Sequence, residues 1–191
     1  MLFQHKLGYR RRVATEVLYY AASSLDGRIA GPEHDLAFLK LLTGAENDYE
    51  TFFVEVDSLI MGAETWRFMV NHGRWPYGEK PTWIVTHADA LEELDGAGDA
   101  IERYSGDLAE LVRLIGERGC RRTWLVGGGS LAGQLLEADL IDELVLTVAP
   151  TFVGSGPTLA DGVFPLRRFQ LTELARFGDD GVRLRYERAR G

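Results

Sequence analysis

Three consecutive glycines, Gly127, Gly128 and Gly129, are the residues of this chain best suited to chemistry. They follow an apolar run and precede a predicted helix, within residues 123–132 (TWLVGGGSLA). Glycine lets the main chain approach a ligand closely, and the first N–H groups of a helix have no partner inside it. Such a junction suits an anion, above all the diphosphate of a nucleotide. The alternative is a tight strand-to-helix turn, which usually needs only one or two glycines.

Charge and composition exclude several other classes of function. The chain has 191 residues, 46% of them hydrophobic, and a formal net charge of −8. The first fourteen residues hold Lys6, Arg10, Arg11 and Arg12 but no acidic residue, so the remainder is more acidic than the whole. A nucleic-acid-binding surface normally needs a net basic face, so we expect no nucleic-acid partner.

We also expect no metal site and no membrane span. Cys120 is the single cysteine, which excludes an internal disulfide, and the four histidines show no ligand spacing. No stretch approaches the roughly 20 apolar residues of a membrane helix, and no signal peptide is recognisable. The sequence therefore predicts a soluble cytoplasmic protein, with a flexible basic arm at residues 1–14 and a single domain at residues 15–191.

The hydrophobic pattern predicts an α/β fold. Strands covered on both faces appear as short continuous apolar runs, which occur at residues 17–22, 58–61, 82–86, 123–126 and 144–149. Apolar residues at helical spacing predict helices near residues 49–56 and 108–115. The alternation around residues 169–177 and 182–187 predicts an antiparallel hairpin. Together these features indicate a mixed, mostly parallel sheet with helices on both faces and a C-terminal hairpin.

A set of motifs in fixed order resembles the dihydrofolate reductase-like superfamily. Within it, the chain is most similar to the reductase domain of bacterial bifunctional riboflavin-pathway deaminase-reductases and their free-standing relatives. The resemblance covers about residues 15–188. The motifs that carry it are residues 21–31 (AASSLDGRIAG), 60–66 (IMGAETW), 84–87 (IVTH), 127–129 (GGG), 142–150 (DELVLTVAP) and 154–157 (GSGP).

This resemblance implies that NADPH lies across the sheet. Thr65 and the helix start after the glycines would hold the diphosphate, Thr86 and His87 the adenosine side, and Ala22 and Ile29 the nicotinamide. The complete set of implied coenzyme residues is Ala22, Ile29, Gly62, Thr65, Thr86, His87, Gly127, Gly128, Gly129, Ser130 and Leu131. For Thr65, the alternative is a helix N-cap.

One departure from the family pattern concerns the choice of coenzyme. The family usually has arginine directly after the glycine of the Met61-Gly62 motif, and this chain has Ala63. That arginine commonly neutralises the 2′-phosphate that distinguishes NADPH from NADH. NADPH is therefore the expected coenzyme, with NADH not excluded. Arg67, Arg122 or His87 are the possible substitutes.

Reduction of an imine-type centre needs a proton as well as a hydride, so a carboxyl group is expected beside the nicotinamide. Asp35 is our predicted catalytic residue, because residues 35–43 resemble the helix that carries the acidic residue of dihydrofolate reductases. Asp26, Thr147 and Gly154 are predicted on the substrate side. The alternatives are a helix cap for Asp35, a turn for Asp26-Gly27 and an ordinary strand residue for Thr147.

The resulting hypothesis is an NAD(P)H-dependent reductase of a small heterocyclic substrate, similar to 5-amino-6-(5-phosphoribosylamino)uracil reductase. A true dihydrofolate reductase is the first alternative, although residues 31–34 (GPEH) replace the L-P-W stretch usual in that group. A nucleotide-binding protein without turnover is the second. The resemblance also implies a homodimer.

Overall fold

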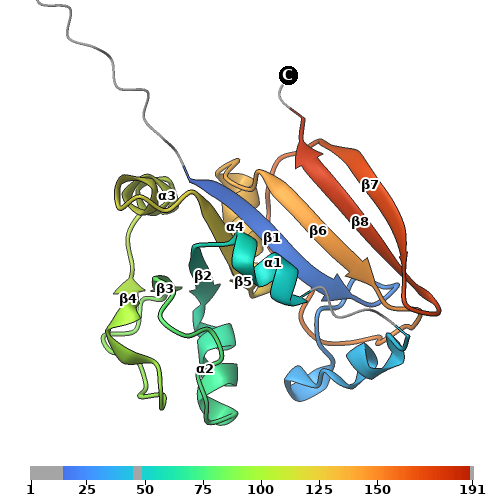
Figure 1. Ribbon diagram of the computed structural model, residues 1–191, viewed down its shortest axis with the longest axis horizontal. Helices are drawn as coiled ribbons and strands as arrows, with labels where there is room; N and C mark the ends of the chain where they lie inside the picture. Colours follow the sequence, from blue (N-terminus) through green and yellow to red (C-terminus); the bar gives the residue numbers. More distant parts are fainter. Residues whose placement is uncertain (1–14, 45–48, 190–191) are drawn as a thin grey trace, which may run out of the picture.

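The described part of the chain, residues 15–44 and 49–189 of this computed structural model, contains a single twisted sheet of eight strands (Figure 1). The strand order is β4-β3-β2-β5-β1-β6-β8-β7. The predicted arm at residues 1–14 lies outside the described residues. The strands are β1 (Glu16–Ser23), β2 (Ser58–Gly62), β3 (Thr82–Val85), β4 (Ile101–Tyr104), β5 (Arg122–Gly127), β6 (Glu143–Val148), β7 (Phe169–Phe177) and β8 (Gly181–Arg188).

Helices cover both faces of this sheet, as the sequence predicts. Figure 1 shows α1 across the near face and α4 behind the sheet. Two separate apolar clusters confirm the layers, since Phe52 and Trp66 pack on one face while Leu111 and Leu135 pack on the other. The helices are α1 (Tyr49–Glu55), α2 (Ala63–Asn71), α3 (Leu108–Glu117) and α4 (Gly129–Glu137), and short 3₁₀ turns lie at Pro32–His34, Ala37–Leu41 and Gly98–Ala100.

Strand pairing explains the two hydrophobic patterns in the sequence. The six strands from β4 to β6 are mutually parallel, and β1 lies between β5 and β6. Their apolar runs are continuous because both faces are covered. β8 pairs antiparallel with β6 and β7, and β7 is exposed along most of its length. The predicted mixed sheet with a terminal antiparallel hairpin is therefore confirmed.

Two elements differ from the sequence-based expectation. β4 was not expected, because only the first and last of its residues Ile101–Tyr104 are partly buried and the four do not form an apolar run. Residues 35–43 were expected to form a helix, but they contain only the 3₁₀ turn Ala37–Leu41. Only Phe38 of that turn is buried, so no apolar stripe stabilises a longer helix here.

Close packing of α4 explains one of the three glycines. A Cβ atom on Gly129 would overlap the Thr158 carbonyl oxygen, and one on Gly133 would overlap the Asp161 carbonyl oxygen. The Asp161 N–H also donates to the Gly129 carbonyl at 2.9 Å. Close packing against the segment after β6 thus requires glycine at position 129.

Candidate functional site

The sheet changes its direction of winding between β2 and β5. The helix after β2 leads outward to β3 on one face, and the helix after β5 leads past β1 to β6 on the other. The carboxyl ends of β2 and β5 therefore carry two helices that diverge, and a crevice opens between them. This switch point is where open α/β sheets bind ligands.

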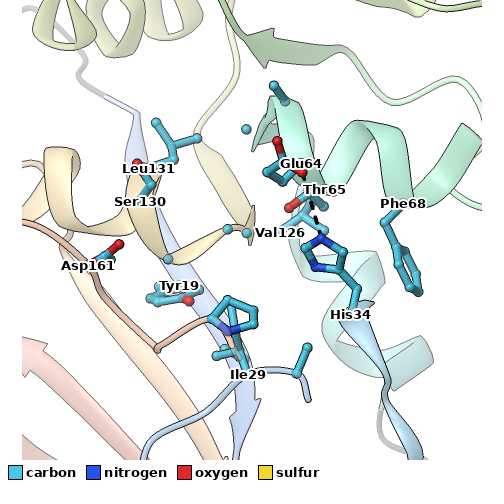
Figure 2. A pocket seen from close by; sticks show the side chains of 18 of the residues that line it. Tyr19, Ile29, His34, Glu64, Thr65, Phe68, Val126, Ser130, Leu131 and Asp161 are labelled. Atoms are coloured by element: carbon cyan, nitrogen blue, oxygen red, sulfur yellow. Dashed lines mark ion pairs between the residues drawn. The ribbon is translucent and has the colours of Figure 1, made fainter. Parts of the chain in front are cut away.

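A cleft of about 760 Å³ occupies this switch point. Figure 2 shows it from close by, with Thr65 on one wall and Ser130 and Leu131 on the other. All eleven residues that the sequence analysis assigned to the coenzyme line this cleft: Ala22, Ile29, Gly62, Thr65, Thr86, His87, Gly127, Gly128, Gly129, Ser130 and Leu131. They come from three strands, two helix starts and loops far apart in the chain, so the fold does bring them together.

Both helices that begin in the cleft lack a capping side chain. Their N-cap residues are Gly62 for α2 and Gly128 for α4, and neither helix has a side-chain hydrogen bond at this end. α3 provides the contrast, because its Asp107 carboxylate accepts the Glu110 N–H at 2.9 Å. Uncapped N–H groups and the positive ends of two helix dipoles thus face one space, which favours an anion there.

The gap between the two helix starts is narrow and depends on glycine. Gly127 has a φ of +151°, a conformation that favours glycine, and its peptide bond to Gly128 is cis. A Cβ atom would lie 3.2 Å from the Thr65 hydroxyl oxygen if built on Gly127, and 3.6 Å if built on Gly128. Side chains at these two positions would fill the space directly in front of Thr65.

Asp26 and Gly154, which were predicted on the substrate side, pair with each other outside the cleft. The Asp26 carboxylate accepts the N–H groups of Val153 at 3.0 Å and Gly154 at 2.8 Å, as well as the Ser24 hydroxyl at 2.5 Å. Hydrogen bonds from Ser24 and from these two amides lower the Asp26 pKa to about 2. Asp26 therefore fastens the loop after β6 to the turn after β1, and its ionised state is poorly suited to proton donation.

Thr147 and Asp35 also lie away from the lining of the cleft. The buried Thr147 hydroxyl accepts the Arg183 Nε–H at 3.3 Å. The Asp35 side chain is exposed and accepts the Ala37 N–H at 2.9 Å, although the N-cap of the turn Ala37–Leu41 is Leu36. The neighbours His34 and Leu36 do line the cleft, so Asp35 stands at its rim.

The charged lining of the cleft was largely missed by the sequence analysis. His34, Glu64 and Asp161 line it together with His87, and no lysine or arginine does so among the described residues. No local pattern singles out His34 or Asp161. Glu64 lies between Gly62 and Thr65 in the first turn of a helix. This position was the one sequence feature that could have indicated that Glu64 lines the cleft.

The remaining walls are apolar and aromatic. Tyr20 stacks on Phe52 with ring centroids 4.0 Å apart, and Trp124 meets both rings edge-on. Burial raises the pKa of Tyr19 and of Tyr77, so both phenols stay neutral near physiological pH. This part of the cleft suits a flat ring, and it is lined by Tyr20, Leu36, Leu39, Phe68, Met69, Tyr77 and Trp124.

Neither a metal-binding cluster nor a membrane-spanning helix occurs among the described residues. No group of three or more histidine, cysteine, aspartate or glutamate side chains could hold a metal ion within residues 15–44 and 49–189. Across the same residues, every helix is too short or too polar to cross a membrane.

Sequence comparison supplies the family. Residues 71–182 match the model of the RibD C-terminal domain. The chain belongs to the RibD C-terminal domain family. It is 30% identical over 178 residues to the protein YwjB of Bacillus subtilis, covering 91% of this chain and 98% of YwjB.

Named relatives match over shorter lengths. RibD of Haemophilus influenzae is 33% identical over 120 residues, which is 56% of this chain and 30% of that protein. A 75-residue match, 31% identical, covers 38% of this chain and 34% of the 2,5-diamino-6-ribosylamino-4(3H)-pyrimidinone 5′-phosphate reductase of Archaeoglobus fulgidus. The chain thus spans about a third of the length of these two relatives.

Solved structures confirm the fold. A crystal structure from Shewanella sp. PV-4 superposes with a TM-score of 0.83 at 25% identity, covering 92% of this chain and all of that one. Dihydrofolate reductase from Enterococcus faecalis, complexed with NADP(H), gives a TM-score of 0.63 at 16% identity over 91% of this chain and 96% of that one. The dihydrofolate reductase-like architecture expected from the motifs is therefore confirmed.

The contacts of Asp26 predict a specific loss of stability in acid. Because folding lowers the Asp26 pKa, its contribution is complete above the unfolded value of about 3.9 and is lost as the pH falls towards 2. Asp26→Asn should therefore be less stable than the wild type at pH 6, with a difference that shrinks between about pH 4 and pH 2. Urea unfolding across this range measures it. The exposed Glu92→Gln is the control, and a difference that does not change with pH would contradict the assignment.

Proposed function

We propose that this protein is an NAD(P)H-dependent reductase that transfers hydride to a heterocyclic or imine-type substrate. The observation that carries the proposal is the pair of uncapped helix starts, α2 and α4, facing one cleft at the switch point of the sheet. A diphosphate there would receive N–H groups from both helices. Membership of the RibD C-terminal domain family and the named reductase relatives support the same activity.

The coenzyme would span the cleft with its diphosphate between Thr65 and Ser130. Its nicotinamide would lie by Ala22 and Ile29, and its adenosine by Thr86 and His87, three strands away. At about 4.8 Å per strand this span is roughly 14 Å, which an extended dinucleotide can bridge. A reduced nicotinamide supplies the hydride, and the protein's part is to orient the ring against the substrate and exclude water.

The substrate would lie in the aromatic part of the cleft, beside the nicotinamide. Tyr20, Trp124 and Tyr77 offer flat apolar surfaces suited to a pyrimidine ring. We propose a phosphoribosylaminopyrimidine of the riboflavin pathway, in line with the Archaeoglobus fulgidus relative. Asp35 would provide the proton as its protonated carboxyl group, which would leave the Ala37 N–H and act through a bound water. Asp26 and Gly154 would act indirectly, by holding the loop after β6, and Thr147 by accepting the Arg183 Nε–H of β8.

Turnover is the test of the activity. The protein should oxidise NADPH when 5-amino-6-(5-phosphoribosylamino)uracil is added. The absorbance of the reduced coenzyme measures this turnover. Asp35→Asn should lower kcat by ~10² or more while leaving coenzyme affinity unchanged, if Asp35 delivers the proton. Unchanged turnover in the variant would remove Asp35 from the mechanism. Reduction of dihydrofolate instead would contradict the proposed substrate, and coenzyme binding without turnover of either substrate would contradict the proposed function.

The charge of the cleft bears on the choice between NADPH and NADH. A 2′-phosphate is normally held by arginine or lysine, and the described lining contains neither. We therefore propose that the 2′-phosphate adds little to binding and that NADH is also accepted. Ala63 is the first residue of α2 and lines the cleft near Thr86, because β2 and β3 are paired neighbours.

Ala63→Arg should accordingly create a preference for NADPH. A charge-assisted hydrogen bond to the 2′-phosphate is worth about 1.5–3 kcal/mol, which predicts at least tenfold tighter NADPH binding with little change for NADH. Titration calorimetry with both coenzymes measures the ratio. Asn71→Arg adds the same charge at the other end of α2 and should leave the ratio unchanged. An equal effect of both variants would contradict the placement of the 2′-phosphate.

We further propose that two copies of the chain associate through the hairpin face of the sheet. Leu171, Leu174 and Val182 are 46%, 65% and 38% exposed. Leu174 lies opposite Leu184, and Leu171 opposite Tyr186, so these side chains share one face. An exposed apolar face of this kind is typical of a subunit contact. The cytoplasmic location expected from the sequence stays a prediction.

Leu174→Asp tests this interface. A carboxylate in the centre of an apolar contact would be desolvated without a partner, so the variant should elute as a single chain where the wild type elutes as two. Light scattering coupled to gel filtration gives the mass. Gln170→Asp, on the opposite face of the same strand, should leave the mass unchanged, and a wild type that is already a single chain would contradict the proposal.

A further inference from the structure

An ion pair joins two segments that line the cleft, directly beside the proposed diphosphate position. His34 Nε2 lies 3.8 Å from Glu64 Oε2, and the two side chains are 45% and 64% exposed. His34 belongs to the segment after β1, whereas Glu64 is in the first turn of α2. Figure 2 shows the imidazole reaching across to Glu64 next to Thr65. The pair therefore stands at the mouth of the gap between the two helix starts.

The segment that carries His34 holds its side chain in this place. Glu33 and His34 both have left-handed backbone conformations, with φ of +54° and +60°. The Gly31 N–H donates to the Asp35 carbonyl at 2.7 Å, and the Asp35 N–H donates to the Pro32 carbonyl at 3.0 Å. These bonds close residues 31–35 into a compact turn from which the imidazole enters the cleft. Two consecutive non-glycine residues in this conformation are uncommon and concentrate at functional sites.

Glu64 occupies a position that favours an anion. It lies in the first turn of the uncapped helix α2, where a negative charge is stabilised by the helix dipole, and it pairs with both His34 and Arg67. A diphosphate bound beside Thr65 would be a second anion at the same helix end. Carboxylate and diphosphate would repel each other, and both would compete for the imidazolium of His34.

We propose that His34 exchanges partners when the coenzyme binds. Its protonated ring moves away from Glu64 and donates a hydrogen bond to a diphosphate oxygen. Glu64 therefore competes with the diphosphate for His34. This inference rests on the proposed function, because it assigns a further residue to the same coenzyme site. It makes His34 a cation of the binding site in a cleft whose described lining has no lysine or arginine.

The exchange makes affinity depend on pH in a defined direction. The groups around His34 are Glu64 and Arg67 on α2, Glu33 and Asp35 in its own turn, and Asp161 on the far wall. A charged imidazolium holds the diphosphate more strongly than a neutral ring does. Affinity should therefore be greatest below the ordinary histidine pKa of about 6.5 and fall as the pH rises above it.

Two substitutions with opposite expected effects test the proposal. The probe is ADP-ribose, whose diphosphate bridge does not titrate near neutral pH, and calorimetry gives its Kd between about pH 5.5 and pH 8, the range in which histidine titrates. For the wild type, Kd should rise about tenfold across this range, as expected for one charge-assisted hydrogen bond. His34→Gln should bind about tenfold more weakly at the acid end and lose the pH dependence. Glu64→Gln should bind several-fold more tightly, because the competing charge is gone.

His72→Gln is the matched control, since His72 is the C-cap of the same helix, α2, its imidazole Nδ1 lies 2.7 Å from the Phe68 carbonyl oxygen, and it does not line the cleft. It should keep the wild-type pH profile. The inference is overturned if His34→Gln retains that profile, if His87→Gln abolishes it instead, or if Glu64→Gln weakens binding. Failure of the wild type to bind ADP-ribose, NADH and NADPH at every pH would overturn the proposed function itself. Thermal unfolding without ligand shows whether each variant is folded.

Discussion

Two helix N-termini without capping side chains meet at one point of this fold, and the proposed chemistry depends on them. Helices normally satisfy their first N–H groups with serine, threonine, aspartate or asparagine, as Asp107 does for α3. Here glycine occupies the N-cap of both α2 and α4, and the two helices diverge from adjacent strands. Amides without a capping side chain at two converging helix starts favour an anion between them.

The three glycines do not share a single role. Gly127 has a backbone conformation that favours glycine, and Gly127 and Gly128 keep the space in front of Thr65 open. Gly129 is required by the Thr158 carbonyl oxygen that packs against α4. Packing therefore explains Gly129, whereas a ligand site at Gly127 and Gly128 stays a prediction. The segment after β6 packs against the first turn of α4.

Sequence reasoning was strongest where periodicity or glycine chemistry dictates structure. Continuous apolar runs predicted five of the parallel strands, and the ordered motifs singled out eleven residues that all line one cleft. Sequence reasoning was weaker where contacts between distant segments determine the structure. Asp26 and Thr147 are short polar residues whose partners, Gly154 and Arg183, come from distant strands and loops, and no local pattern shows that pairing. β4 depends on pairing with β3, and the pair of His34 and Glu64 exists only because two walls converge.

The most direct measurement is amide NMR of residues 127–131 during titration with reduced coenzyme. If the amides at the start of α4 hold the diphosphate, saturating NADH or NADPH should shift the resonances of Gly129, Ser130 and Leu131 strongly, while those of α3 stay in place. If both coenzymes at saturation leave the amides of residues 127–131 unmoved, the diphosphate is not held there and the account of this site is wrong.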